Sequence, residues 1–248
     1  MFFPRLRRHA KWMFVFLAVA LGGGFVLFGV GTQAGTGVGD LFRGGGSSGV
    51  PSISAAQKQT EQNPKDVAAW RALSTALQTN GQIDKAIEAQ RQVVALAPKD
   101  GQALRELATL YLSQAGSKQQ QAQLVQLKAA YATGSFPGGL TSPSGQSILD
   151  DTIAQTINAQ ASVALQTLVG AAQAASSAAV DAYKQLAALS PGDPNVQLEL
   201  AQAAQQAGDT ATAILAYEAF LKLAPDDPNA PIVKAQLKQL KQTSPASR

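Results

Sequence analysis

The sequence predicts an all-α protein whose helices stack as repeated helix-turn-helix units, and three observations support this. Apolar residues recur at the spacing of amphipathic helices over most of residues 53–242. A pattern about 34 residues long recurs in phase, with Gly and Pro at corresponding places between the helices. Alternating runs of β-branched residues, which mark strands, are rare along the 248 residues.

The clearest unit is residues 67–98, VAAWRALSTALQTNGQIDKAIEAQRQVVALAP, in which Asn80-Gly81 predicts the turn between two helices. Ala86 is small enough to let the second helix approach the first closely. A single hairpin of this kind cannot bury both of its faces, so it requires stacked neighbours. One face of the first helix carries three large apolar residues: Trp70, Leu73 and Leu77.

This spacing resembles the tetratricopeptide repeat (TPR), a helix-turn-helix of about 34 residues. The family has a large residue at position 4, Leu at 7, a small residue at 8, Ala at 20 and Pro at 32. Counted from Val67, these positions hold Trp70, Leu73, Ser74, Ala86 and Pro98. The resemblance implies an all-α TPR solenoid over residues 53–242.

Three further units are predicted near residues 101–132, 148–191 and 194–227. The unit at 194–227 is clear, whereas the other two are degenerate. In 101–132 the expected second helix, from about Lys118 to Tyr131, lacks the Ala and Pro landmarks. In 148–191 the second helix keeps its landmarks, but the Ala-rich first helix before it has no large residue at position 4. A helix from about 53 to 63 precedes the first unit, an amphipathic helix at 230–242 caps the last, and 243–248 form a tail.

Residues 1–11 form a basic leader, and residues 12–30 contain no charge. Such a run spans about 28 Å as a helix, close to the thickness of a bilayer core. We therefore expect a single-pass anchor in the cell membrane, with the N-terminus cytoplasmic and the repeat domain extracytoplasmic. The alternative is a cleaved signal peptide and a secreted domain. A lipoprotein is excluded because the chain has no Cys to carry the lipid.

Two stretches have the composition of linkers or loops. Residues 31–52 are rich in Gly and Ser, which predicts a flexible tether between the anchor and the solenoid. Residues 132–147 contain several Gly and Pro residues, which predict a loop between the repeats. This loop is interpreted either as a binding loop or as an elongated turn.

Charge and composition argue against several classes of function. The net charge of +4 resides in the first 43 residues, and the rest of the chain balances both signs, so nucleic-acid binding is not expected. The chain has one histidine, His9 in the leader, and no cysteine. No Ser or Thr lies three residues before a Lys, and no Gly cluster leads into a phosphate-binding motif. We expect no enzyme activity, no metal site and no cofactor.

The TPR resemblance implies a concave groove that binds a protein or peptide. Arg71 and Arg105 would take a carboxylate or peptide carbonyls, or alternatively form salt bridges with acidic neighbours such as Glu106. Thr75 and Thr109 stand where the family's carboxylate clamp has Asn, so recognition of a C-terminal carboxylate is not predicted. The expected groove residues are Arg71, Thr75, Gln78, Arg105, Thr109, Leu112, Asn195, Leu198, Gln202 and Gln205.

The layout of leader, span, tether and repeats resembles that of the translocon-associated TPR proteins of the YfgM type. This resemblance implies an ancillary chaperone or adaptor near the secretion machinery, with weak and promiscuous binding of clients. Two alternatives are a scaffold subunit of a cell-envelope assembly and a regulatory subunit of a membrane complex. Both alternatives predict one tight partner. The oligomeric state does not follow from the sequence.

Overall fold

The computed structural model describes residues 51–133 and 151–243. The expected leader, membrane helix, most of the linker and most of the 132–147 loop lie outside these residues. Within them the chain forms eight α-helices and no strand, as the sequence predicts. The helices are α3 (Ile53–Gln62), α4 (Val67–Thr79), α5 (Ile83–Leu96), α6 (Gly101–Ala132), α7 (Asp151–Leu189), α8 (Pro194–Ala207), α9 (Thr210–Leu223) and α10 (Ala230–Thr243).

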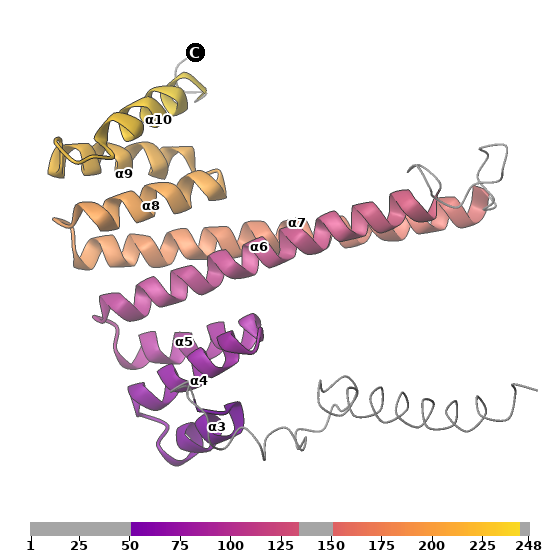
Figure 1. Cartoon of the computed structure of the whole chain (residues 1–248), viewed down its shortest axis with the longest axis horizontal. Helices are drawn as coiled ribbons and strands as arrows, with labels where there is room; N and C mark the ends of the chain where they lie inside the picture. The colour runs from indigo at the N-terminus through magenta and orange to yellow at the C-terminus, as the bar shows by residue number, and fades with distance from the viewer. Residues whose placement is uncertain (1–50, 134–150, 244–248) are drawn as a thin grey trace, which may run out of the picture. The chain divides into compact units, whose positions relative to one another are not determined.

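The helices stack in chain order, each against its sequence neighbours (Figure 1). Aspartate side chains begin four of them by accepting hydrogen bonds from free backbone N–H groups of the first turn. Two hairpin turns contain a glycine with positive φ, Gly81 at 72° and Gly208 at 75°. Residues with a Cβ rarely adopt this backbone conformation. The four capping aspartates are Asp66, Asp100, Asp193 and Asp209.

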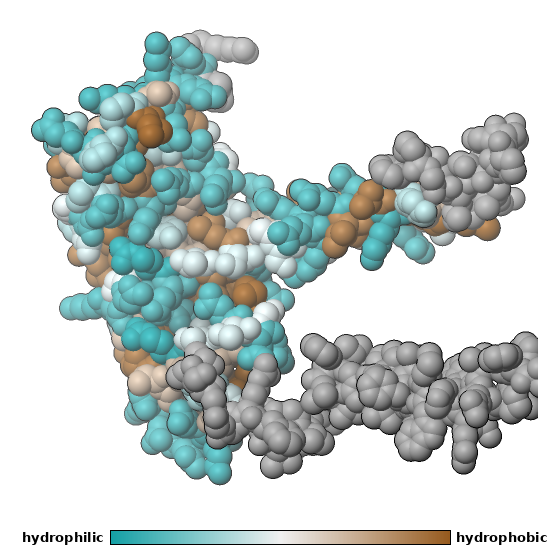
Figure 2. Space-filling view, viewed as in Figure 1, coloured by the Kyte–Doolittle hydropathy of each residue, from teal (hydrophilic) through white to brown (hydrophobic). Residues whose placement is uncertain are grey.

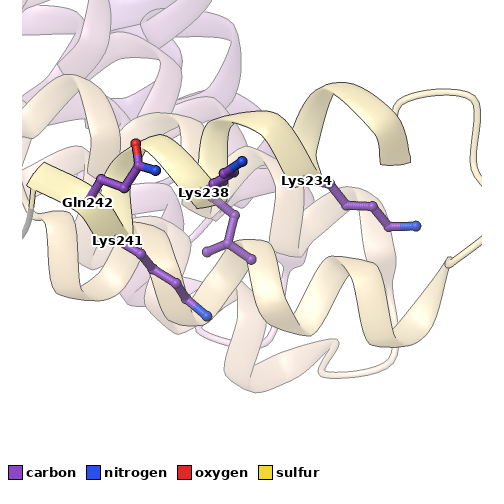
Figure 3. A pocket seen from close by; sticks show the side chains of 5 residues that line it. Lys234, Lys238, Lys241 and Gln242 are labelled. Carbon is purple, nitrogen blue, oxygen red and sulfur yellow. The ribbon is translucent and has the colours of Figure 1, made fainter. Parts of the chain in front are cut away.

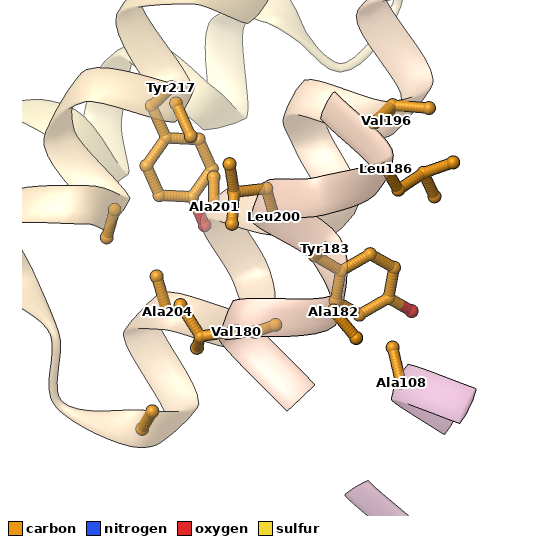
Figure 4. Close-up of a cluster of buried hydrophobic side chains, with 14 of the residues drawn as sticks. Ala108, Val180, Ala182, Tyr183, Leu186, Val196, Leu200, Ala201, Ala204 and Tyr217 are labelled. Atoms are coloured by element: carbon orange, nitrogen blue, oxygen red, sulfur yellow. The ribbon is translucent and has the colours of Figure 1, made fainter. Parts of the chain in front are cut away.

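Small residues fill the helix crossings in the core. Three alanines at equivalent repeat positions, Ala86, Ala179 and Ala213, are 0% exposed, which agrees with the prediction that the paired helices approach closely there. Tyr217 and Phe220 of α9 are the largest fully buried side chains among the described residues, and both belong to the C-terminal cluster. Tyr217 is labelled in Figure 4. The buried residues form one cluster from α3 to α6 and a second from α6 to α10.

The middle of the stack differs from the division into helices that the sequence predicts. In the second expected unit, the second helix at Lys118–Tyr131 is part of α6, which runs without a break. In the third expected unit, the Ala-rich first helix and the second helix together form the single helix α7. Gly116 and Gly170 lie inside these helices, and neither has the positive φ of the turn glycines. The described residues therefore contain three hairpins, α4–α5, α6–α7 and α8–α9, instead of four.

The middle hairpin is much longer than the other two. Its helices have 32 and 39 residues, against 13 or 14 in the neighbouring hairpins, so their far halves extend beyond the stack as an arm (Figure 1). We define the arm as residues 116–132 of α6 and 152–171 of α7. The two helices meet along residues spaced three and four apart, mostly alanines, whose small size permits close packing. These seam residues include Ala115, Ala122, Val125 and Ala129 of α6, and Ala154, Ile157, Ala161, Ala164 and Leu168 of α7.

Helix α7 also has a property of membrane helices. Among the described residues, Thr152–Leu189 is the one helical stretch long and apolar enough to qualify as a candidate membrane span. Buried core helices can meet the same criterion. Here the stack half of α7 packs against both α6 and α8.

Candidate peptide-binding face

The residues expected to line the groove lie on α4, α6 and α8, the first helices of the three hairpins. Ion pairs join α4 to α6 and α6 to α8, so the structure brings the three predicted sets together on one face. We call this surface the first-helix face. Its polar members determine what it can bind.

Arg71 of α4 is held by two carboxylates of the next hairpin. Its Nη2 lies 2.6 Å from Asp100 Oδ2, and its Nε lies 3.3 Å from Glu106 Oε2. The hydrogen bond to Asp100 is the main cause that raises the pKa of Arg71, and partial burial opposes it. The same hydrogen bond lowers the pKa of Asp100 below its ordinary value. Arg71 therefore joins two hairpins as an ion pair, the alternative that the sequence left open.

Arg105 of α6 makes the equivalent link to α8. Its Nε donates to both carboxylate oxygens of Glu199, at 3.1 and 2.9 Å. This hydrogen bonding raises the pKa of Arg105. Beside the pair lies Tyr183 of α7, and burial raises the pKa of its hydroxyl.

The two ion pairs follow one rule of repeat geometry. Arg71 and Arg105 occupy the same repeat position, and Glu106 and Glu199 both occupy the next position of the following first helix. An arginine of one hairpin thus reaches a glutamate of the next, twice in succession. In the last hairpin Leu198 replaces the arginine, and it packs against the core. We call this pattern the Arg–Glu ladder.

Glu106 is the most connected acid of the ladder. Besides Arg71, it accepts hydrogen bonds from Gln90 Nε2 at 2.9 Å and from Gln102 Nε2 at 3.0 Å. Gln90 is only 1% exposed and also donates to the carbonyl of Ala103 at 3.0 Å. The network ties α5 and α6 together below the face.

The groove residues that are fully exposed are uncharged, whereas the ion-paired side chains beside them are about one-third exposed. The hydroxyls of Thr75 and Thr109 donate to the carbonyls of Arg71 and Arg105 in the preceding turn, at 3.0 and 2.9 Å. Gln205 accepts a hydrogen bond of 2.7 Å from Tyr217. Leu112 is half-buried against the core. The exposed predicted residues are Thr75, Gln78, Thr109, Asn195, Gln202 and Gln205.

Sequence reasoning did not identify Asp100, Gln90 and Glu199 as parts of this surface. Glu199 could have been found, because it follows Leu198 as Glu106 follows Arg105, one repeat position later. Asp100 has a double role, since it caps α6 as well as pairing with Arg71. Gln90 gives no such signal, because its partners lie on another helix.

Away from this face, a surface cavity of about 610 Å³ lies along α10 (Figure 3). Lysines line it, as expected for the polar outer side of a terminal helix, and Lys241 pairs with Glu218 of α9 at 2.7 Å. In the described part of the chain no three His, Cys, Asp or Glu side chains are grouped closely enough to bind a metal ion.

The repeat pattern, the stacked hairpins and the first-helix face define a TPR-type protein-interaction module. The tetratricopeptide repeat family model matches residues 49–100, 71–138 and 171–228. These matches cover more than half of the chain, which therefore belongs to this family. TPR proteins bind protein or peptide partners, and this chain is a module of that kind.

Several solved structures are similar to this chain. MamA shares 17% identity over 70% of this chain and 81% of its own, with a TM-score of 0.25. A thermophilic TPR protein of Thermus thermophilus shares 17% identity over 77% and 89%, with a TM-score of 0.26. Pseudomonas aeruginosa pilF shares 19% identity over 85% and 90%, with a TM-score of 0.24. No curated protein matches the chain.

Proposed function

We propose that the protein binds extended polypeptide segments of low charge on its first-helix face, as a membrane-anchored adaptor or ancillary chaperone near the secretion machinery. The observation that carries the binding mode is the Arg–Glu ladder. Because Asp100, Glu106 and Glu199 pair with Arg71 and Arg105, the predicted groove residues that stay fully exposed carry hydroxyls and amides.

Neutral hydroxyls and amides suit the backbone of an extended chain. Each residue of such a chain offers one N–H donor and one C=O acceptor, and the side-chain amide of Gln or Asn can both donate and accept. Hydrogen bonds of this kind do not depend on the client's side chains, so binding is weak and tolerant of sequence. An acidic client would have to compete with Glu106 and Glu199 for the arginines.

The proposal of a membrane anchor is supported by residues 1–30. A basic leader followed by 19 uncharged residues fits a single span with the leader in the cytoplasm. The Gly-rich residues after the span would then act as a tether. Alkaline extraction of native membranes tests this part, because an anchored protein stays in the pellet and a cleaved, secreted protein does not.

Site-specific photocrosslinking tests the binding part. The photoreactive residue is placed at Gln202 on the first-helix face or, as a matched control, at Gln92 on α5, which is also exposed. In full-length protein in its own membrane, many clients should crosslink to position 202 and few to position 92. A single partner at position 92 with none at 202 would reject the chaperone hypothesis in favour of a scaffold.

A substitution series separates binding from folding. Thr109→Ala with Gln202→Ala removes exposed polar groups without disturbing the ladder, so client crosslinks from a probe at Gln78 should fall severalfold while thermal unfolding is unchanged. Arg71→Ala with Arg105→Ala is a poorer test, because it also breaks two links between hairpins. Unchanged crosslinking in the Thr109 and Gln202 variant would contradict the proposal.

A further inference from the structure

The turn between α4 and α5 contains the one asparagine of the chain that precedes a glycine. The sequence has five asparagines, and the other four precede Pro, Ala, Val and Ala. Glycine leaves the side-chain amide before it open to attack by its own backbone nitrogen, because it has no Cβ to obstruct the approach. The stack presents a largely hydrophilic surface to water (Figure 2), and both residues of the dipeptide Asn80-Gly81 are exposed. Water therefore reaches this dipeptide.

The folded turn keeps the two groups that would react apart. The side-chain Nδ2 of Asn80 donates to the carbonyl of Ala76 at 2.8 Å. The backbone N–H of Gly81 donates to the carbonyl of Gln78 at 2.9 Å. A five-membered ring that joins the two groups needs the Cβ of Asn80 and the nitrogen of Gly81 on the same side of the bond between them. At the ψ of 11° that Asn80 adopts they are not, so the turn must open before the groups react.

We propose that Asn80 is a site of covalent modification, at which the side-chain amide is hydrolysed at a rate set by the opening of this turn. The backbone nitrogen of Gly81 loses its proton and attacks Cγ of Asn80. The bond between this nitrogen and Cγ forms, the bond between Cγ and Nδ2 breaks, and ammonia leaves. Water then opens the cyclic imide, giving aspartate by attack at Cγ or isoaspartate by attack at the backbone carbonyl carbon. The net reaction consumes one water and needs no oxidant.

The helix that follows the turn is held weakly at its start. Gln82 at the N-cap of α5 makes no side-chain hydrogen bond to the first turn, whereas aspartates make such bonds at four other helices. A helix start without a side-chain cap frays more easily. Within the hairpin the buried Ser74 hydroxyl donates to the carbonyl of Ala86 at 3.1 Å. We therefore expect local opening of this hairpin to be more frequent than unfolding of the whole stack.

Hydrolysis at Asn80 would weaken the end of α4. A carboxylate cannot donate to the carbonyl of Ala76, and its charge lies at the C-terminal end of the helix, where the helix dipole disfavours it. Isoaspartate also lengthens the backbone by one atom within the turn. The hydrogen bond of 2.9 Å from the N–H of Gln82 to the carbonyl of Leu77 spans this turn and depends on its length.

Peptide mapping by mass spectrometry of aged full-length protein tests the site. At mildly alkaline pH, Asn80 should show the mass increase of amide hydrolysis, with isoaspartate among the products. The rate should rise with pH, because the deprotonated nitrogen is the nucleophile. Asn158 is the internal control, since it is exposed on α7 but precedes alanine, and it should stay unmodified. Equal modification of both asparagines, or none of Asn80, would overturn the proposal.

Two substitutions test whether the first hairpin sets the rate. Ser74→Ala removes the hydrogen bond to Ala86 and should speed the modification of Asn80 about fivefold, the factor that one lost hydrogen bond gives. Tyr217→Phe is the matched control, because it removes a hydrogen bond to Gln205 in the last hairpin and should leave the rate unchanged. Equal acceleration by both substitutions, or acceleration by neither, would show that local opening does not set the rate.

A third substitution should slow the modification. Gln82→Asp supplies the cap that α5 lacks, as Asp209 does at the corresponding place before α9, so the modification should slow severalfold. In concentrated urea this difference should vanish, because the unfolded chain has no turn to stabilise. An equal effect in the folded and the unfolded chain, or no effect in the folded chain, would overturn control by the turn.

Discussion

Gln90 shows how much of the stacking depends on single polar side chains. Its amide is 1% exposed and joins two groups of the next helix, the Glu106 carboxylate and the Ala103 carbonyl. A buried amide can be tolerated only while its hydrogen bonds are made. The sequence gives no hint of this role, because Gln90 lies within an unremarkable helical pattern whose partners are more than ten residues away.

Gln90→Leu should lower the free energy of unfolding by about 1–3 kcal/mol, because it leaves the buried acceptors without their donor. Chemical denaturation measures the effect. Gln92→Leu is the control, since the same substitution at an exposed site of the same helix should change stability little. A loss of equal size at both positions would mean that the amide of Gln90 has no special role.

Asp100 both caps α6 and forms an ion pair with Arg71. The pH dependence of stability distinguishes these two contributions. Its pKa is lowered chiefly by Arg71, so its pairing stabilises the fold above the ordinary carboxyl pKa and is lost as pH falls through the lowered value. At neutral pH Asp100→Asn should cost about 0.5–1 kcal/mol, because Asn keeps the cap but not the charge.

Asp100→Ala should cost about 1 kcal/mol more than Asp100→Asn, because the cap is also lost. Below about pH 4 the difference between wild type and Asp100→Asn should shrink, since the aspartate of the unfolded chain then takes up its proton while the paired aspartate keeps its charge to lower pH. Denaturation curves at several pH values check this. A difference that stays constant down to about pH 2.5 would show that the ion pair contributes nothing.

At the scale of helices and turns, glycine ends a helix at one place in the chain and lies within a helix at another. Gly81 was correctly predicted as a turn, because Asn precedes it between two amphipathic patterns. Gly116 lies within α6 even though the repeat pattern predicts a turn nearby, since Ala, Ser and Lys around it all permit a helix. Gly116 therefore did not end the helix even though Ser follows it, and the extra length of α6 and α7 was missed.

Gly116→Ala and Gly208→Ala should change stability in opposite directions. A Cβ at either position would meet no atom within 4 Å, so backbone conformation decides the outcome. At Gly208, with φ of 75°, alanine should cost about 1 kcal/mol, and asparagine less because it tolerates the left-handed region. At Gly116 alanine should add about 0.5–1 kcal/mol. Melting temperatures that fall for both variants would contradict this view of α6.

At the scale of the whole molecule, the contacts run between neighbouring helices, as expected of a solenoid. The resemblance to TPR proteins was enough to predict this stacking and which helices form the first-helix face. The sequence did not predict that the two degenerate units form one long hairpin. The reason is that the alanines along which the arm helices meet include no large landmark residue. The ladder partners likewise depend on how successive hairpins meet.

A destabilising substitution at one end of the stack should therefore affect only the neighbouring helices. Val233 of α10 is 2% exposed and packs into the C-terminal core, so Val233→Ala should cost about 2 kcal/mol. Hydrogen exchange should accelerate in α8 and α9, while α4 and α5 keep their protection. Ile232→Ala, at a site 60% exposed, is the control and should change neither region. Equal acceleration in all hairpins would indicate one cooperative unit.

The unbroken course of α7 has a mechanical consequence. One half of this helix is clamped between α6 and α8 in the stack, and the other half runs along the arm without a hinge. The helix therefore acts as a lever with its fulcrum at the edge of the stack. With an outer half of about 30 Å, a tilt of about 10° at the clamped end would displace the far end by about 5 Å. Small adjustments of the hairpins are thus amplified at a point remote from the first-helix face.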